Sequence, residues 1–269
     1  MNTKLGIWTS YYMELDVKDA VKRFIDNGIY CAELSDEHGL KLLEADEDVV
    51  KTGREFAAFL KENSFEMTQG HLWLYAKICS DPDAVDILCR WIDLYEAIGV
   101  KTMVLHCDPL LNEEISYEEK LDRNVERLKL LAEHIRDKDI YICLENLNRI
   151  VPSVDDILYI IEKVGSDRLA VCLDTGHLNL TLKNQREFIL KAGDKLKALH
   201  IADNRGEKDD HLMPYGGGTV DFCEVVSALR EVGYCGMFNL EIPGERSIPL
   251  ELRDAKLAYI KRCYAYLMK

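Results

Sequence analysis

The sequence lacks the features that mark membrane, secreted and disulfide-bonded proteins. No apolar run approaches the roughly 18 residues of a membrane-spanning helix, and the start, MNTKLGIWTS, has no basic segment followed by an apolar stretch and a cleavage site. The nine cysteines are an odd number and include no CxxC pair, which argues against a disulfide framework. We therefore expect a cytoplasmic protein with reduced thiols and no membrane partner.

Positive charge is also scarce. The chain has 34 Lys and Arg against 48 Asp and Glu, so its formal net charge is −14, and no cluster of basic residues stands out. Such a charge repels nucleic-acid backbones at long range. We expect a small-molecule substrate rather than a nucleic acid, and the composition leaves open whether the protein forms a homo-oligomer.

Eight short apolar runs alternate with longer segments of helical periodicity. In the first of these segments, Val17, Val21 and Phe24 fall on one helical face, and Gly28 follows as a helix stop. Strands that alternate with helices of this length pair in parallel through crossover connections. The expected strands are residues 5–10, 30–34, 66–72, 101–107, 140–146, 169–174, 196–201 and 237–242.

Eight such units predict an α/β fold, the (β/α)8 TIM barrel. The 269 residues are close to the roughly 250 of one barrel, so we expect a single domain over residues 1–269. No GxGxxG or GxxxxGKS/T motif follows the first expected strand, which argues against a nucleotide-binding open sheet. The longest irregular stretch, 202–219, follows the seventh strand and is expected to be a functional loop.

Histidines gather at the expected carboxyl ends of the strands, where barrels carry their active sites. The chain has seven histidines, and about one would fall in these positions by chance. Four do so, and a fifth lies in the loop after the seventh strand: His71, His106, His177, His200 and His211. Imidazole and carboxylate together are ligands for zinc, manganese, iron or cobalt.

Acidic and imidazole side chains at the ends of the last four strands point to one metal site. On the fifth strand Glu145 faces inward, while its apolar neighbour Leu144 faces the helices. A carboxylate in such a run is costly to bury alone, and a metal ion offsets that cost. The alternative is a metal-free network of ion pairs and hydrogen bonds. We expect one divalent ion on four residues: Glu145, Asp174, His200 and Glu241.

Five motifs resemble one barrel superfamily. They are LEN at 144–146, LDTGH at 173–177, LHIAD at 199–203, DDHLMPYGGGTVDF at 209–222 and LEI at 240–242. In these motifs the chain is similar to the xylose isomerase-like TIM barrels, which include sugar isomerases and epimerases and the endonuclease IV family of abasic-site nucleases (AP endonuclease family 2). The resemblance extends from the third expected strand to the eighth and implies a metal-dependent enzyme.

The epimerase members imply proton transfer next to a carbonyl through an enediolate. By this resemblance one Mn²⁺, Zn²⁺, Co²⁺ or Mg²⁺ ion is bound by the four residues above, and Glu145 and Glu241 remove and return the proton. His177 would be a third catalytic residue, which binds the substrate or a second ion. Arg205 would bind the substrate, although it lies one residue short of the expected spacing. The resemblance thus favours an isomerase or epimerase of carbohydrate metabolism that acts on a sugar, sugar phosphate or polyol.

The endonuclease members imply another use of the same barrel. Their trinuclear zinc site has nine ligands, and each has a counterpart of the same type here: His71, His106, Glu145, Asp174, His177, His200, Asp209, His211 and Glu241. We favour sugar chemistry because of the net charge and the acidic stretch 44–48 after the second strand, where DNA would approach. The same motifs are also compatible with a related metal-dependent dehydratase and with a non-catalytic binding protein.

Aromatic residues after the early strands are candidates for the wall of a substrate pocket. They either stack on a sugar or pack over the barrel mouth. We assign Trp8 and Trp73 to substrate binding. The whole set is Trp8, Tyr11, Tyr12, Trp73 and Tyr75.

Overall fold

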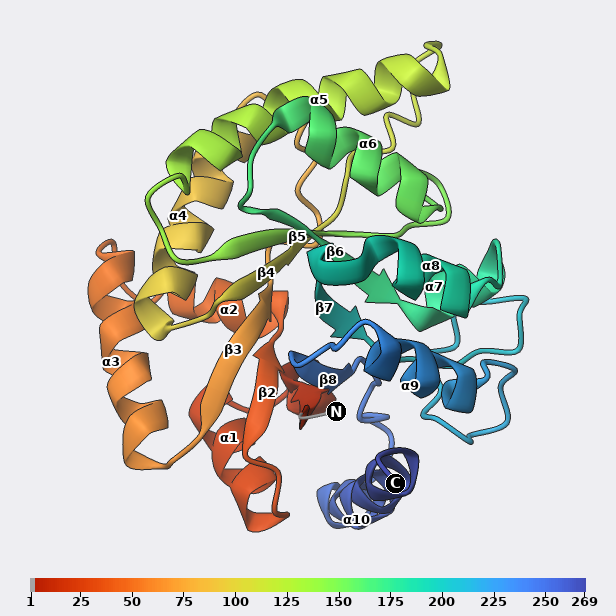
Figure 1. The fold of residues 1–269 in the computed structure, drawn as a ribbon. Coiled ribbons are helices and arrows are strands. Elements are labelled where there is room, and N and C mark those ends of the chain that lie inside the picture. Colours follow the sequence, from red (N-terminus) through yellow and green to blue (C-terminus); the bar gives the residue numbers. More distant parts are fainter. Residues whose placement is uncertain (1–2) are drawn as a thin grey trace.

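Eight parallel strands surround the centre of the molecule (Figure 1). The computed structural model describes residues 3–269. Each strand lies within one of the predicted runs, except that the first begins one residue earlier. The strands are β1 (Lys4–Trp8), β2 (Cys31–Leu34), β3 (Glu66–His71), β4 (Thr102–Leu105), β5 (Tyr141–Glu145), β6 (Leu169–Asp174), β7 (Leu196–His200) and β8 (Met237–Leu240).

Helices follow the strands and form the outer layer. They are η1 (Thr9–Tyr12), α1 (Val17–Asp26), α2 (Asp36–Leu43), α3 (Val49–Glu62), α4 (Ala84–Ile98), α5 (Tyr117–His134), α6 (Val154–Val164), α7 (Thr175–Leu180), α8 (Gln185–Ala192), η2 (Gly193–Lys195), α9 (Phe222–Glu231) and α10 (Leu250–Leu267). Asp16 caps α1 by accepting a hydrogen bond from the amide of Lys18, and Gly28 follows the helix with a φ of 70°. Among residues 3–269, no helix combines the length and apolar composition needed to cross a bilayer.

The sheet closes into a barrel between its two edge strands. Strands pair in the order β7-β6-β5-β4-β3-β2-β1-β8. A single parallel bridge between Ile201 and Leu240 joins the edges: the amide of Ile201 donates to Asn239 at 2.8 Å, and the amide of Glu241 donates to Ile201 at 3.2 Å. The prediction of a (β/α)8 TIM barrel is therefore confirmed.

The first predicted run was too long at its carboxyl end. Residues 9 and 10 were expected to continue the strand, but Trp8 is the last residue of β1 and pairs with Glu33 of β2. The chain then turns into η1, where the amide of Met13 donates to the carbonyl of Ser10. Thr9 and Ser10 are buried in the turn, and both residue types occur in strands as well as in turns, so the sequence pattern alone did not locate this boundary.

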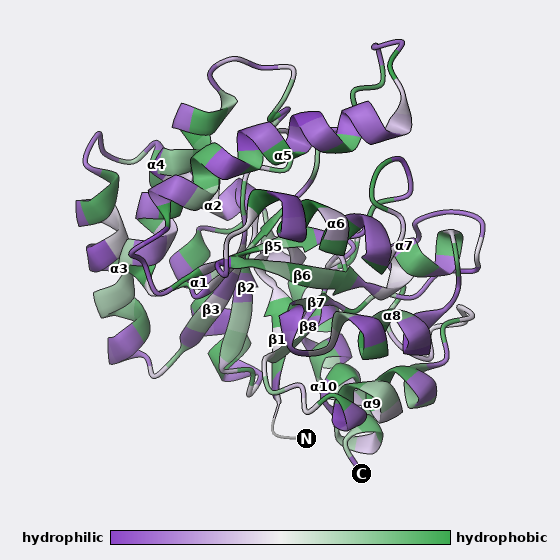
Figure 2. Ribbon diagram, turned by 45° about the horizontal axis from the view of Figure 1, so that its top comes forward, coloured by the Kyte–Doolittle hydropathy of each residue, from purple (hydrophilic) through white to green (hydrophobic). Residues whose placement is uncertain are grey.

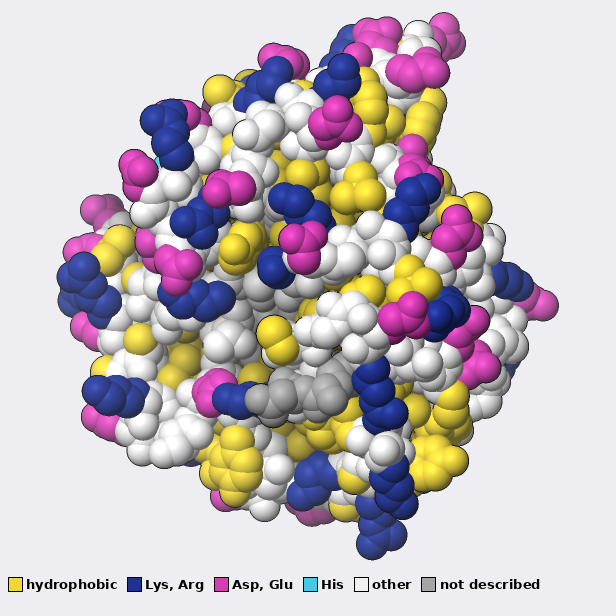
Figure 3. All heavy atoms as spheres, in the orientation of Figure 1, with side chains coloured by type: hydrophobic (Ala, Val, Ile, Leu, Met, Phe, Trp, Pro, Cys, Tyr) yellow, Lys and Arg dark blue, Asp and Glu magenta, His cyan; other side chains and the backbone are white. Residues whose placement is uncertain are grey.

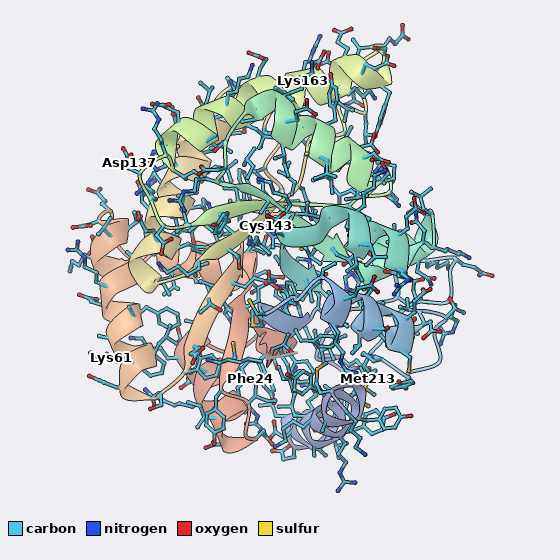
Figure 4. The ribbon with its side chains drawn as sticks, viewed as in Figure 1. Phe24, Lys61, Asp137, Cys143, Lys163 and Met213 are labelled. Atoms are coloured by element: carbon cyan, nitrogen blue, oxygen red, sulfur yellow. The ribbon has the colours of Figure 1, made fainter. Side chains whose placement is uncertain are left out.

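Apolar side chains pack in two places, one outside the ring of strands and one inside it. The large outer core joins strands to helices, and Figure 2 shows mostly hydrophobic strands beside helices of alternating character. Cys143 lies near the centre of the ring (Figure 4). The inner cluster consists of Val104, Cys143, Ala170, Cys172 and Ala198.

The surface of the molecule has mixed charge. Over most of the face shown in Figure 3, Lys and Arg side chains are interspersed with Asp and Glu side chains.

The alternation of side chains along each strand carries polar groups from the inner cluster to the barrel mouth. On β5, Cys143 belongs to the inner cluster and Glu145 lies two residues further along the same face. On β6, Cys172 and Asp174 repeat this arrangement. The structure agrees with the predicted inward direction of these side chains. Glu145 and Asp174 both lie at the carboxyl ends of their strands, at the mouth of the barrel.

Candidate metal centre

Four buried side chains meet at the carboxyl ends of β5 to β8. Each offers one ligand atom, and these atoms all lie within 4.8 Å of one another. The Nδ1 atom of His200 lies 3.2 Å from Oε2 of Glu145 and 3.4 Å from Oε2 of Glu241. The four residues that the sequence predicted to share an ion are thus brought together: Glu145, Asp174, His200 and Glu241.

The donors of this group fit a divalent cation. Oδ2 of Asp174, Nδ1 of His200 and Oε2 of Glu241 are buried without a hydrogen-bond partner in the described part of the chain. Buried polar atoms are normally hydrogen-bonded, so three unpaired atoms in one group need another explanation. Carboxylate oxygens and a neutral imidazole suit manganese, zinc or cobalt, and the ion would satisfy all three atoms at once.

A second group shares Glu145 with the first. Nε2 of His106 lies 2.9 Å from Oε2 of Glu145, and Nε2 of His71 lies 3.6 Å from the same oxygen. The two imidazole nitrogens are 3.3 Å apart. The three side chains have the spacing of a further metal-binding group.

A third group lies at the edge of the mouth around Asp209. Oδ2 of this residue is 3.1 Å from Nε2 of His177 and 3.1 Å from Nε2 of His211. Burial lowers the pKa of His211, but the bond to Asp209 outweighs it and raises that pKa to about 10. On its other side the His177 ring lies 3.0 Å from Glu145, which links this group to the first.

The loop after β7 positions this third group. Asp203 and Leu212 form an antiparallel bridge with two hydrogen bonds of 2.7 Å, so the intervening residues fold back over the mouth. The Asp203 carboxylate accepts the amide of Val220 and fills the space beside Gly218, where a Cβ would lie 2.1 Å from it. Glycine at 218 therefore allows the close packing that fixes the loop predicted as functional.

One important residue was missed by the sequence analysis. Glu33 of β2 is fully buried, and its Oε1 lies 3.0 Å from Nε2 of His200. Asn239 donates to the other oxygen of Glu33. A ring that donates from Nε2 to Glu33 presents its Nδ1 lone pair to the carboxylates, which is how an outer carboxylate orients a metal-binding histidine. An acidic residue inside the apolar run CAEL was the available signal.

The two glutamates of the first group have opposite electrostatic surroundings. Burial raises the pKa of Glu145, but His200 and His106 outweigh it and hold that pKa well below its usual value. Burial is the main cause that raises the pKa of Glu241 to about 8; His200 and His211 oppose this rise, and the charges of Glu145 and Asp174 add to it. Without a cation, the cluster thus retains protons that an ion would displace.

The other predicted site residues lie outside this cluster. Arg205 is at the surface, with a side chain 61% exposed and 3.3 Å from Asp210, so its assignment to substrate binding stays a prediction. Trp8 and Trp73 are half-buried, and their assignment also stays a prediction. For Tyr11 and Tyr12 the structure selects packing over pocket lining, because both rings are completely buried and pack against Phe24.

A cavity of about 430 Å³ opens beside the second group. It lies between the segments that follow β3, β4 and β5, and His106 is part of its lining. The His106 side chain is 21% exposed, although it also contacts buried Glu145. The cavity therefore reaches the candidate metal ligands from the mouth of the barrel.

Comparisons with known proteins agree on one family. The protein-family model described as xylose isomerase-like TIM barrel matches residues 15–263 of this chain. D-psicose 3-epimerase of Enterocloster bolteae is 27% identical over 88% of this chain and 81% of its own length. A probable endonuclease 4 of Metamycoplasma arthritidis is 26% identical over 77% of this chain and 80% of its own length.

Two further comparisons concern coverage and fold. The uncharacterised protein y4fM of Sinorhizobium fredii is 29% identical over 69% of this chain, and the match spans 59% of y4fM, which is less than two thirds of its length. A crystal structure of D-psicose 3-epimerase in the presence of D-fructose superposes with a TM-score of 0.80 at 17% identity, covering 98% of this chain and 99% of that one. At this identity the superposition shows the shared fold.

Proposed function

Since the chain belongs to the xylose isomerase-like TIM barrel family, we propose that it is a metal-dependent isomerase or epimerase of a sugar, sugar phosphate or related polyol. The observation that carries the proposal is the buried group at the ends of the last four strands, which has three unpaired donor atoms. The proposed ligands are Glu145, Asp174, His200 and Glu241. The similarity to a D-psicose 3-epimerase over most of the chain supports ketose chemistry.

The residues of this group divide the work of proton transfer. A bound divalent ion would polarise the carbonyl and neighbouring hydroxyl oxygens of the substrate and acidify the C–H bond beside them. Glu145, held ionised by the surrounding histidines, is suited to accept that proton. Glu241 belongs to the same group and is the residue proposed to return the proton. Between these two steps the substrate passes through an enediolate.

Residues around the group hold it in place and bind the substrate. Glu33 and Asn239 fix the ring of His200 from below. His177 has a side chain 15% exposed at the mouth and contacts Glu145 on one side and Asp209 on the other. In the proposed complex His177 would hydrogen-bond a substrate hydroxyl by giving up one of these two contacts. Burial of the whole group excludes water, which strengthens each electrostatic contact.

An endonuclease IV-like phosphodiesterase is the second candidate. The observation that favours it is the arrangement of all nine counterpart residues in three groups, the first two of which share Glu145. Three zinc ions in such groups would activate water and bind a phosphate. The net charge of −14 opposes the approach of DNA. A dehydratase would use the first group alone and differ only in expelling water.

The discriminating experiment is isotope exchange on a panel of sugars. The protein is stripped with a chelator, loaded with Mn²⁺ and incubated with ketoses, aldoses and sugar phosphates in D₂O. We expect deuterium at the carbon next to the carbonyl of at least one sugar, with an epimeric or isomeric product. Cleavage of an abasic duplex by the zinc-loaded protein, without exchange in any sugar, would instead establish the second candidate.

A further inference from the structure

The cavity beside His106 has a charge that sets it apart from the acidic molecule around it. Lys77 and Arg149 line it from the segments after β3 and β5, and both side chains are exposed. Within residues 3–269, neither has a carboxylate at ion-pair distance, whereas Arg205 and Arg123 at the same end of the barrel are paired. The two cations thus keep their charge available to a ligand.

The acidic residue in the lining does not cancel these charges. The Asp108 carboxylate is buried and accepts hydrogen bonds from the amides of Cys79, Ser80 and Leu110 and from the hydroxyl of Ser80. These donors stabilise the ionised carboxylate without removing its charge, so Lys77 and Arg149 against Asp108 leave the lining with a formal charge of +1. The cavity remains net positive in a chain whose formal charge is −14.

The size and walls of the cavity suit a small organic ligand. A volume of 430 Å³ falls within the roughly 300–1,000 Å³ of small-molecule sites. Apolar side chains would contact a carbon skeleton, and His106 connects the cavity to Glu145 at 2.9 Å. The apolar lining residues are Leu74, Tyr75, Ala76, Pro109, Leu147 and Ile150.

We propose that this cavity binds an anionic group of the substrate, a phosphate or carboxylate remote from the reacting carbonyl, through Lys77 and Arg149. The inference rests on the proposed function, because it places the reacting end of the same molecule at Glu145. An acidic protein repels an anionic substrate at long range, so an uncompensated pair of cations at the entrance provides the local attraction that such a substrate needs. A neutral sugar would leave both cations without a partner.

The test compares matched sugars that differ in charge. Deuterium exchange by the Mn²⁺-loaded protein is measured for D-fructose and D-fructose 6-phosphate, for D-ribulose and D-ribulose 5-phosphate, and for D-fructuronate as the carboxylate arm. We expect kcat/KM to be higher for an anionic member by about tenfold or more, which corresponds to about 1.4 kcal/mol. The double variant Lys77→Met/Arg149→Met should bring the ratio close to one.

The control is Lys129→Met/Arg136→Met, which removes the same charge near the end of α5, where the chain turns toward the start of β5. This variant should keep the preference. Equal rates for neutral and anionic sugars in the wild type, or a preference kept by Lys77→Met/Arg149→Met, would overturn the inference. If no sugar exchanges, the proposed function fails, and calorimetric titration with the same sugars then tests anion binding by the cavity separately. Tighter binding of the anionic sugar than of its neutral partner would support anion binding, and equal affinities would refute it.

Discussion

The same strands contribute to two adjacent layers of side chains inside the barrel, one apolar and one of ionisable residues. The lower layer is apolar and includes Cys143, Cys172 and Ala198. Two residues further along the same strands lie Glu145, Asp174 and His200, which form the upper layer together with Glu241 after β8. The backbone geometry is alike, so the difference lies in the side chains: the lower layer stabilises the fold by apolar contact, whereas the upper layer costs stability until a cation is bound.

The largest contrast between the layers should appear in activity. Glu145→Gln keeps the shape of the side chain but removes the proton acceptor, so we expect the exchange rate to fall by about 10²–10⁴-fold. Cys143→Ala, on the same face of β5, should cost about 1 kcal/mol of stability and leave exchange unchanged. Near-normal exchange in Glu145→Gln would end the proposed proton transfer.

In the metal-free protein, the amount by which the upper layer lowers the free energy of unfolding should depend on pH. Burial raises the pKa of Glu241 from 4.5 to about 8 in the folded state, so folding favours the protonated form. The contribution of Glu241 to the free energy of unfolding is fully present below pH 4.5 and is lost as the pH rises toward 8. Metal-free Glu241→Gln should therefore become more stable than metal-free wild type by roughly 3–5 kcal/mol at pH 8.

Urea unfolding of both metal-free proteins at pH 5 and pH 8 measures this difference. With saturating Mn²⁺ the order should reverse, because the ion stabilises only the wild-type carboxylate set. A stability difference that does not change with pH would show that Glu241 is ionised in the folded apoprotein and that the upper layer carries no such cost.

The contact between Glu33 and His200 should affect metal affinity. Glu33→Leu removes the acceptor for Nε2, and outer-shell partners of this kind typically contribute about 10–100-fold to affinity. Glu33→Gln keeps an acceptor oxygen and should recover much of the loss. Competition with a metal-chelating dye gives the affinities without any activity assay. Equal affinity in Glu33→Leu and wild type would mean that the ring is positioned by packing alone.

The smallest effect is expected outside both layers. Arg205 is 61% exposed, so Arg205→Ala should change stability by less than about 0.5 kcal/mol. If Arg205 binds the substrate, KM should rise while the metal content stays the same. An unchanged KM would remove it from the site and confine substrate contacts to the mouth and the cavity beside His106.

Much of the fold followed from sequence because the barrel repeats its signal eight times. Apolar runs and glycines such as Gly28 located the strands and helix ends. The alternation of side chains along β5 and β6 predicted that Glu145 and Asp174 point into the barrel, and the order of the strands brings the two residues together. The end of β1 was not predicted, because Thr9 and Ser10 are buried in the turn and are as compatible with a strand as with η1.

The outer contacts of the site could not be predicted in the same way. Glu33 meets His200 across the barrel, 167 residues apart in sequence, and no local pattern connects them. Tyr11 and Tyr12 followed a strand end like pocket residues but turn into the core of the barrel wall. The cavity beside His106 is formed by three separate loops, so its charge appears only when they are assembled.

The central claim is that the upper layer holds a divalent cation, and metal binding tests it most directly. Chelator-stripped protein is dialysed against Mn²⁺ or Zn²⁺ and analysed by mass spectrometry for bound metal, beside the variant Asp174→Asn. We predict at least one tightly bound ion per chain in the wild type and its loss in the variant. A stripped wild type that binds no ion at micromolar concentration, with its fold intact, would contradict the account.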